Sequence, residues 1–254
     1  MISSFAHNIQ LTVIVPAAGV GKRMLAPCPK QYLTINNESV LSHTVNRLLS
    51  HPNITQVILA LSDNDDYFAE TALASNDNII RVSGGKERVD SVLSGLQAVK
   101  EAQWVLVHDA ARPCLTHDDI DKLIKACLAH SCGGILAAPV VDTMKRATDN
   151  NNIDNTVERK HLWHAFTPQM FKTTELKKAI DDAQAKNISI TDESSAIEYA
   201  GLPSLLVSGR RDNIKITRPE DLALASFYLK QQALEQQRLE QLQKIEQNKD
   251  DRCE

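Results

Sequence analysis

The sequence predicts an α/β fold in which a mostly parallel sheet carries helices on both faces and a β-hairpin projects from it. The first observation is the regular alternation of short apolar segments with helix-like segments through the first half of the chain. The second is that these apolar segments lack a polar face, which is typical of parallel strands buried on both sides. The third is a polar, Asn-rich turn between two short extended segments within residues 140–165.

Hydrophobic periodicity locates the individual elements. Runs rich in Val, Ile and Leu predict strands at residues 11–15, 56–61, 79–82, 104–107 and 134–140. Apolar residues at helical spacing predict helices at residues 40–50, 89–99 and 117–130, and a further helix is expected to end near Ala74. Later in the chain we expect a helix capped by Thr191 and ended by Gly201, a short strand before Pro219, and a helix that begins at Pro219.

The chain is expected to form one domain and a tail. Residues 1–230 form the domain, which includes the projecting hairpin at about residues 140–163, called the arm below. Residues 231–254 are rich in Gln and Glu, and their thin apolar stripe predicts a frayed helical or disordered extension to which no function is assigned.

Composition limits the partners. Lys and Arg total 28 against 32 Asp and Glu, and this net charge of −4 argues against a general nucleic-acid surface. The apolar runs are too short to cross a bilayer, and the first residues lack the features of a signal peptide. The five cysteines show neither CxxC nor metal-ligand spacing, so we expect reduced thiols and a cytoplasmic protein.

Three loops follow predicted strands at the edge where parallel sheets bind ligands: PAAGVGKR, SGGKER and HDAARP. The first is not a Walker A loop, because Pro16 and Arg23 occupy the positions that require Gly and Ser or Thr. Nor is it a dinucleotide fingerprint, because Met24 replaces the third glycine. Its two glycines and its cations nevertheless predict a cradle for a polyanion.

Several motifs in register resemble one enzyme family. These are PAAGxGxRM…PKQY, GGxERxxSV, VLVHDAARP, APVxDTMKR, TPQ, ITDE and DNIKITRPED, which together span about residues 11–230. They resemble the 2-C-methyl-D-erythritol 4-phosphate cytidylyltransferases, which have a Rossmann-like nucleotidyltransferase fold, and the chain resembles the monofunctional form. The resemblance implies transfer of CMP from CTP to 2-C-methyl-D-erythritol 4-phosphate with release of pyrophosphate, a step of non-mevalonate isoprenoid biosynthesis.

The resemblance also implies roles for individual residues. Arg23 and Lys30 would stabilise the transition state, while Arg159 and Lys215 would position the acceptor phosphate. The implied nucleotide contacts are Pro16, Ala17, Ala18, Gly19, Gly84, Gly85, Ser91 and Ala110. The implied contacts of the second substrate are Asp109, Arg112, Thr143, Thr167 and Thr191.

Mg²⁺ is the expected cofactor, held mainly by triphosphate oxygens and water, with Asp109 as its protein ligand, directly or through water. The resemblance implies a homodimer in which the arm, with Thr143 and Arg159, completes the site of a second subunit. His108 is interpreted as structural, and Asp192 and Glu193 as parts of a capped helix.

Two other functions remain open at this point. A cytidylyltransferase for another polyol phosphate, such as ribitol 5-phosphate, would share the CTP loop and differ near Arg112 and Thr191. A nucleotide-binding regulator without catalysis would have no need for both sets of cations.

Overall fold

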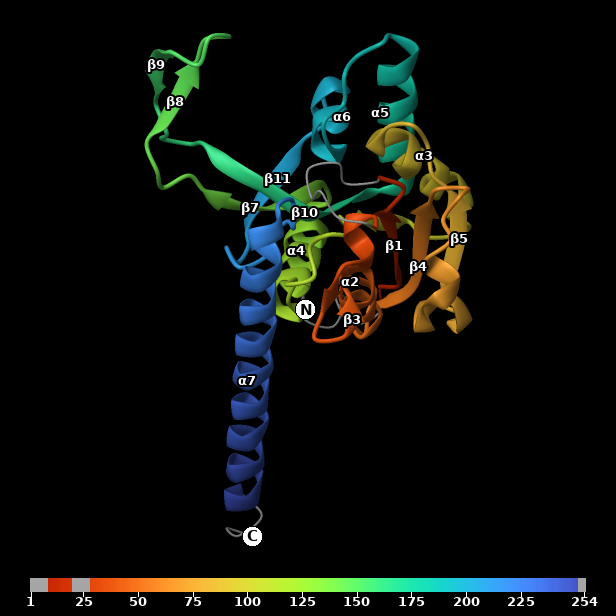
Figure 1. Ribbon diagram of the computed structural model, residues 1–254, viewed down its shortest axis with the longest axis vertical. Helices are drawn as coiled ribbons and strands as arrows, with labels where there is room; N and C mark the ends of the chain where they lie inside the picture. Colours follow the sequence, from red (N-terminus) through yellow and green to blue (C-terminus); the bar gives the residue numbers. More distant parts are fainter. Residues whose placement is uncertain (1–8, 20–27, 251–254) are drawn as a thin grey trace.

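A seven-stranded sheet forms the centre of the computed structural model, which describes residues 9–19 and 28–250 (Figure 1). Arg23 lies outside the described residues. The strands are ordered β11-β7-β10-β6-β1-β4-β5. Their bounds are β1 Leu11–Pro16, β4 Ile54–Leu61, β5 Ile79–Ser83, β6 Trp104–Val107, β7 Gly133–Pro139, β10 Trp163–Lys172 and β11 Ser204–Ser208. Within this sheet β10 alone runs antiparallel to its neighbours, which confirms the mostly parallel architecture.

Helices cover both faces of the sheet. Their bounds are α2 Val40–Leu49, α3 Arg88–Ala98, α4 His117–His130, α5 Thr173–Ala185 and α6 Glu193–Tyr199. Figure 1 shows α3, α5 and α6 on one side of the sheet and α2 and α4 on the other. Successive residues of β1 point to opposite faces, so Val13 and Val15 pack with α2 and α4 while Ile14 packs with α3. This two-sided burial explains why the strands have no polar face.

The helix expected before Ala74 is wrong. The structure has two short 3-10 helices there, η3 Phe68–Glu70 and η4 Ala72–Ser75. The Asp65 carboxylate accepts hydrogen bonds from the backbone N–H groups of Tyr67 and Phe68, at 3.2 and 2.9 Å, and turns the chain locally. Two buried residues, Phe68 and Leu73, are too few to hold a longer helix on the sheet.

The strand expected before Pro219 is also wrong. Residues 212–218 form no strand, although Ile216 is buried and its N–H donates to the carbonyl of Ala111 at 2.9 Å. The segment therefore lies against the loop that follows β6 instead of joining the sheet. A further small sheet pairs β2 Thr34–Ile35 with β3 Glu38–Ser39, just after the 3-10 helix η2 Lys30–Tyr32.

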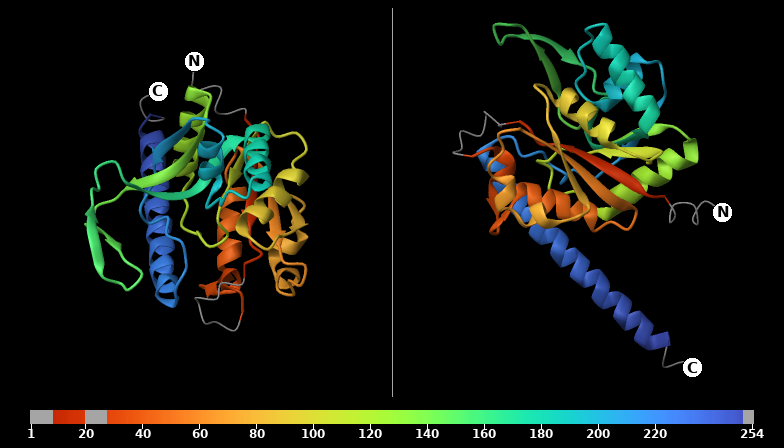
Figure 2. Two further views of the ribbon diagram at one scale, coloured as in Figure 1. Left: turned by 90° about the horizontal axis from the view of Figure 1, so that it is seen from above. Right: turned by 90° about the vertical axis from the view of Figure 1, so that its right-hand side faces the viewer.

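The arm contains a two-stranded antiparallel hairpin, β8 Met144–Ala147 with β9 Ile153–Val157. It projects from the end of β7 and returns into β10, away from the body of the molecule (Figures 1 and 2). Almost every residue of the hairpin is exposed, and Ile153 exposes 69% of its surface. The described chain thus places a mostly solvated hairpin at one end of the sheet.

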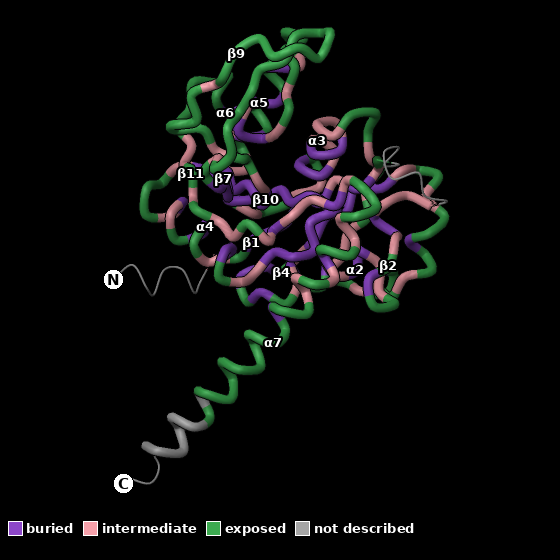
Figure 3. The backbone as a smooth tube through the Cα atoms, turned by 60° about the vertical axis from the view of Figure 1, so that its left-hand side comes forward, coloured by how far each residue is buried: buried purple, intermediate pink, exposed green. Residues whose placement is uncertain are grey.

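The last helix, α7 Pro219–Asp250, packs on the body only through its first part. Leu222, Ala225 and Leu229 join a small apolar cluster against the β2–β3 hairpin and the loop after β6. Beyond Gln232 the helix extends away from the body, and residues 233–242 are exposed (Figure 3). No described helix is both long and apolar enough to cross a bilayer.

Candidate active site

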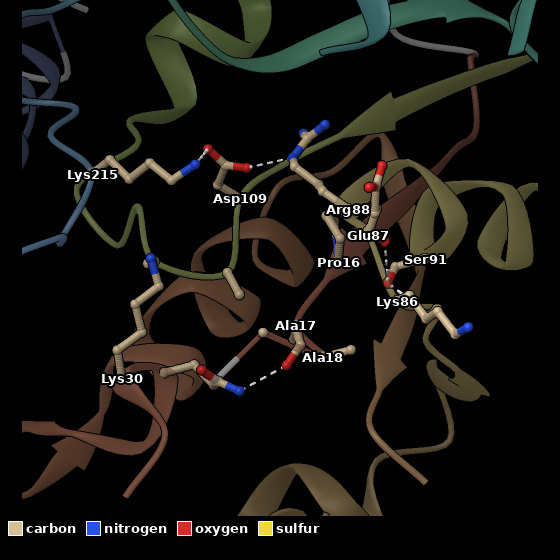
Figure 4. Close-up of a pocket in the computed structure, with 15 residues that line it drawn as sticks. Pro16, Ala17, Ala18, Lys30, Lys86, Glu87, Arg88, Ser91, Asp109 and Lys215 are labelled. Atoms are coloured by element: carbon tan, nitrogen blue, oxygen red, sulfur yellow. Dashed lines mark hydrogen bonds and ion pairs between the residues drawn. The ribbon is translucent and has the colours of Figure 1, made fainter. Parts of the chain in front are cut away.

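A cavity lies at the carboxyl ends of β1, β5 and β6, where the sequence places its three loops. Ten of the predicted site residues line it: Pro16, Ala17, Ala18, Gly19, Lys30, Gly85, Ser91, Asp109, Ala110 and Lys215. Figure 4 shows Lys30 and Lys215 on one side of this cavity and Lys86 on the opposite side. Strands that run in parallel bring these loops to one edge, although they are far apart in the sequence.

Two hydrogen bonds fix the backbone at the exit of β1. The N–H of Ala17 donates to the carbonyl of Ala60 at 2.8 Å, which extends the pairing of β1 with β4. The buried side chain of Gln31 donates to the carbonyl of Ala17 at 2.7 Å. Small side chains at Ala17, Ala18 and Gly19 leave the cavity wall as bare backbone, which a ligand can approach closely.

The turn between β5 and α3 forms a second wall. The N–H of Gly84 donates to the carbonyl of Leu61 at 2.6 Å, and the N–H of Gly85 donates to the hydroxyl of Ser91 at 3.0 Å. A Cβ atom on Gly84 would lie 2.4 Å from the Cβ of Ala18, so glycine is required for the two walls to meet. Ser91 is buried and does not serve as the N-cap of α3, a position that Glu87 occupies.

Asp109 is the centre of the site's charges. Its Oδ1 accepts from Nε of Arg88 at 3.1 Å, and its Oδ2 lies 2.8 Å from Nζ of Lys215 and 3.3 Å from Nε of Arg112. Burial by itself raises the pKa of the Asp109 carboxyl, but the three cations outweigh burial and hold the pKa far below its usual value. Asp109 is therefore ionised throughout the neutral range.

A buried network supports Asp109 from behind. The backbone N–H of Asp109 donates to the hydroxyl of Thr167 at 3.0 Å, and that hydroxyl lies 3.0 Å from Nδ1 of His108. Nε2 of His108 lies 3.0 Å from the carbonyl of Arg112, whose Nη1 donates to the carbonyl of Asn213 at 2.7 Å. Burial lowers the pKa of His108 to about 4, so its ring is neutral and structural at pH 7.

The structure separates the remaining predicted residues from the cavity wall. Arg112 and Thr167 are buried behind Asp109, and Gly84 lies behind Gly85 in the turn. Three further residues, Thr143, Arg159 and Thr191, are exposed and do not line this cavity in the single chain.

The arm residues lie at the base of the hairpin. Thr143 directly precedes β8, and Arg159 follows β9 and donates from Nη1 to the carbonyl of Val141. Thr191 is not the cap of α6, because the carboxylate of Asp192 accepts from the N–H of Ser195 at 3.0 Å and takes that role. The carboxylate of Asp192, directly after Thr191, accepts from a free N–H group of the first turn.

Arg88 was not among the predicted site residues, and Glu193, which is part of a capped helix as predicted, also pairs with Arg88. Arg88 lines the cavity and forms a two-bonded fork with Glu193, which is buried at the first residue of α6. The position of Arg88 in SGGKER, directly after a strand at the ligand edge, could have indicated that Arg88 lines the site. Glu193 resembles an ordinary first-turn acid, and nothing local in the sequence distinguishes it.

Comparisons with known proteins identify relatives of this chain. The sequence profile of the IspD family, 2-C-methyl-D-erythritol 4-phosphate cytidylyltransferase, matches residues 11–231. A protein of that name from Colwellia psychrerythraea is 63% identical over 238 residues, covering 90% of this chain and 98% of the relative. The namesake from Vibrio parahaemolyticus is 59% identical over 219 residues, covering 85% and 94% of the two chains.

Solved structures give the same result. The crystal structure of the Francisella tularensis 2-C-methyl-D-erythritol 4-phosphate cytidylyltransferase matches with a TM-score of 0.75 and 35% identity, over 86% of this chain and 99% of the other. The Thermus thermophilus structure of the same name matches with a TM-score of 0.74 and 26% identity, over 87% and 100% of the two chains. The chain therefore belongs to the 2-C-methyl-D-erythritol 4-phosphate cytidylyltransferase family.

Proposed function

We propose that this protein transfers CMP from CTP to 2-C-methyl-D-erythritol 4-phosphate and releases pyrophosphate. Family membership supports the reaction, and one observation of the site carries its chemistry. Lys30 and Lys215 face a cavity whose wall at the exit of β1 consists of small residues, while Lys86, Glu87 and Arg88 line it beside Gly85 at the exit of β5. Such a cavity admits a polyphosphate against the backbone and presents cations to it.

The reaction requires charge stabilisation more than proton transfer. A phosphate oxygen of the acceptor, already anionic at neutral pH, attacks the α-phosphorus of CTP in line and pyrophosphate leaves. No general base is needed, which agrees with His108 being buried with both ring nitrogens within hydrogen-bond distance of neighbours. Lys30, together with Arg23 of the opening loop, would stabilise the charge that develops on the α-phosphate.

Lys215 would hold the attacking phosphate. Its Nζ lies 2.8 Å from Oδ2 of Asp109, and its side chain remains 36% exposed, so it can still contact a ligand in the cavity. Asp109 fixes the ammonium group without occupying all of its three donors. We assign the nucleotide to the walls formed by Ala17, Ala18, Gly85 and Ser91.

Mg²⁺ fits this site as a companion of the triphosphate. The described residues contain no group of three or more His, Cys, Asp or Glu side chains that could hold a metal ion by themselves. Asp109 lines the cavity, but both of its oxygens contact cations, so it would reach the ion through water while triphosphate oxygens supply the other ligands. When bound, Mg²⁺ would neutralise part of the triphosphate charge.

We extend the proposal to a cytoplasmic homodimer. Thr143 and Arg159 are exposed at the base of the arm and do not line the cavity of their own chain. A cation that contacts the acceptor phosphate from the arm would therefore have to serve the cavity of another subunit. Mixing Arg159→Ala with Lys30→Ala subunits tests this, because shared sites restore activity in mixed dimers and sites confined to one chain do not.

The reaction is tested by a ³¹P NMR time course with CTP, Mg²⁺ and either 2-C-methyl-D-erythritol 4-phosphate or ribitol 5-phosphate. Pyrophosphate and a new diphosphate pair with the methylerythritol substrate alone are expected. Product with ribitol 5-phosphate alone would retain the chemistry and refute the substrate. No turnover with either acceptor, in a protein that binds CTP, would refute the enzymatic function.

A further inference from the structure

Arg88 joins two carboxylates that come from distant parts of the chain. It is the first residue of α3, and its Nε donates to Oδ1 of Asp109 at 3.1 Å. Its Nη1 and Nη2 donate to Oε1 and Oε2 of Glu193 at 2.6 and 3.0 Å. Burial lowers the pKa of Arg88, but Glu193 and Asp109 outweigh burial and raise it, so the guanidinium stays charged. Both ends of the planar group are therefore fixed.

Glu193 has no surface of its own in the cavity. It is 2% exposed, and Arg88 is its ion-pair partner within the described part of the chain. A buried ion pair is seldom more stabilising than well-packed apolar side chains of the same volume, because both charges lose their water. The geometry that the pair imposes, rather than its stability, is therefore the feature to explain.

That geometry reaches Lys215 through Asp109. Arg88 holds Oδ1 of Asp109, which leaves Oδ2 directed at Nζ of Lys215, 2.8 Å away. Figure 4 shows Arg88 and Lys215 meeting the two oxygens of Asp109 from opposite sides. A carboxylate bound at one oxygen cannot rotate freely, so the position of the second oxygen, and of the cation on it, is set by the first.

We infer that Glu193 and Arg88 are positioning residues that orient Asp109 and, through it, Lys215. The inference rests on the proposed function for its catalytic consequence. It requires the fork and not only the charge of Arg88, because a lysine at residue 88 would supply one charged point and could not hold both Glu193 and Asp109 in fixed directions.

The test uses Arg88→Lys and Glu193→Gln in the full-length protein, with Arg210→Lys as the matched control. Arg210 makes a similar fork with Asp212, from Nε at 3.0 Å and Nη2 at 2.7 Å, and does not line the cavity. We expect each of the first two variants to lower kcat by about 10- to 100-fold, as a displacement of about 1 Å does. The Kd for CTP, measured by titration calorimetry, should stay within about threefold, and Arg210→Lys should leave kcat unchanged.

Crystal structures of the variants provide the readout that does not depend on turnover. We expect Oδ2 of Asp109 and Nζ of Lys215 to separate from 2.8 Å to beyond hydrogen-bond distance in Glu193→Gln. An unchanged Asp109–Lys215 contact, or a kcat of Arg88→Lys within twofold of the wild type, would overturn the inference. A wild-type protein without turnover would refute the proposed function instead, and the crystal structures would still decide the positioning role.

Discussion

Gly84 offers a sharp test of how the nucleotide walls are held together. In Gly84→Ala the new Cβ would lie 2.4 Å from the Cβ of Ala18 and 3.1 Å from the carbonyl oxygen of Leu61. Carbon atoms pack best at about 3.5–4.0 Å, so the two walls must separate by roughly 1 Å. The 2.6 Å hydrogen bond from the N–H of Gly84 to Leu61 would stretch with them.

The expected result has two parts. Overpacking of this kind lowers the free energy of unfolding by about 1–3 kcal/mol, which urea unfolding measures directly. Ala18 and Ser91 line the cavity on either side of the clash, so the affinity for CTP should also fall. If the free protein relieves 1.4 kcal/mol of the strain by moving the walls apart and binding of CTP must restore it, the affinity falls by about tenfold. Titration calorimetry well below the unfolding temperature measures this affinity.

Gly19→Ala is the control for stability. Gly19 lines the same cavity, and a Cβ placed there would have no described heavy atom within 4 Å. Its free energy of unfolding should match that of the wild type. If Gly84→Ala unfolds at the same urea concentration as Gly19→Ala, the close contact of the two walls is not a constraint and the reasoning fails.

Four further predictions concern pH, metal, cations and the last helix. Burial lowers the pKa of His108 to about 4 in the folded protein, whereas the pKa of an unfolded histidine is near 6.5. The neutral His108 therefore contributes its full share to the free energy of unfolding above pH 6.5, and about 3 kcal/mol of that free energy is lost as the pH falls to 4. Urea unfolding with the same midpoint at pH 7 and pH 5 would contradict this. EDTA should abolish turnover without changing the melting temperature of the ligand-free protein, since no described cluster of acids, His or Cys holds a metal; a lower melting temperature would reveal a structural ion. Lys30→Ala and Lys215→Ala should each lower kcat on the order of 10²–10³-fold. Lys86→Ala, on the opposite wall, should change kcat less than threefold. Equal losses of kcat in all three variants would mean that only the total positive charge of the cavity matters, not the position of each cation. A chain that ends after Gln232, the last buried residue described on α7, should keep the melting temperature and kcat of the full protein in thermal unfolding and turnover assays; loss of either would assign a role to the projecting part of α7.

The sheet and its ligand edge were predictable because their signals are local. Two-sided apolar strands identify a parallel sheet, and parallel strands bring their carboxyl ends to one edge whatever their separation in sequence. For this reason Pro16, Gly85 and Asp109 could be expected in one cavity without knowledge of the strand order. The prediction of a helix before Ala74 was wrong because the carboxylate of Asp65 competes with helix hydrogen bonding, and hydrophobic periodicity does not detect this effect.

The second half of the site depends on how distant elements dock. Arg88 and Glu193 are 105 residues apart, and their side chains meet because α6 packs against α5, which in turn packs against α3. Likewise, the motifs that contain Arg112 and Thr167 do not reveal that both side chains lie behind Asp109. The orientation of these side chains depends on tertiary packing, and the few residues of a motif do not determine that packing.

Strand β10, which is antiparallel to its neighbours in the seven-stranded sheet, connects the arm to the cavity. The chain leaves the sheet where β7 ends, forms the arm, and re-enters beside it, where Trp163 pairs with Pro139. A few residues further along the same strand, the hydroxyl of Thr167 seats the backbone of Asp109. The same strand, β10, therefore begins at the arm and reaches the cavity at Thr167. A contact that fixed the arm would therefore also restrain the end of β10 that leads to Thr167 and the backbone of Asp109.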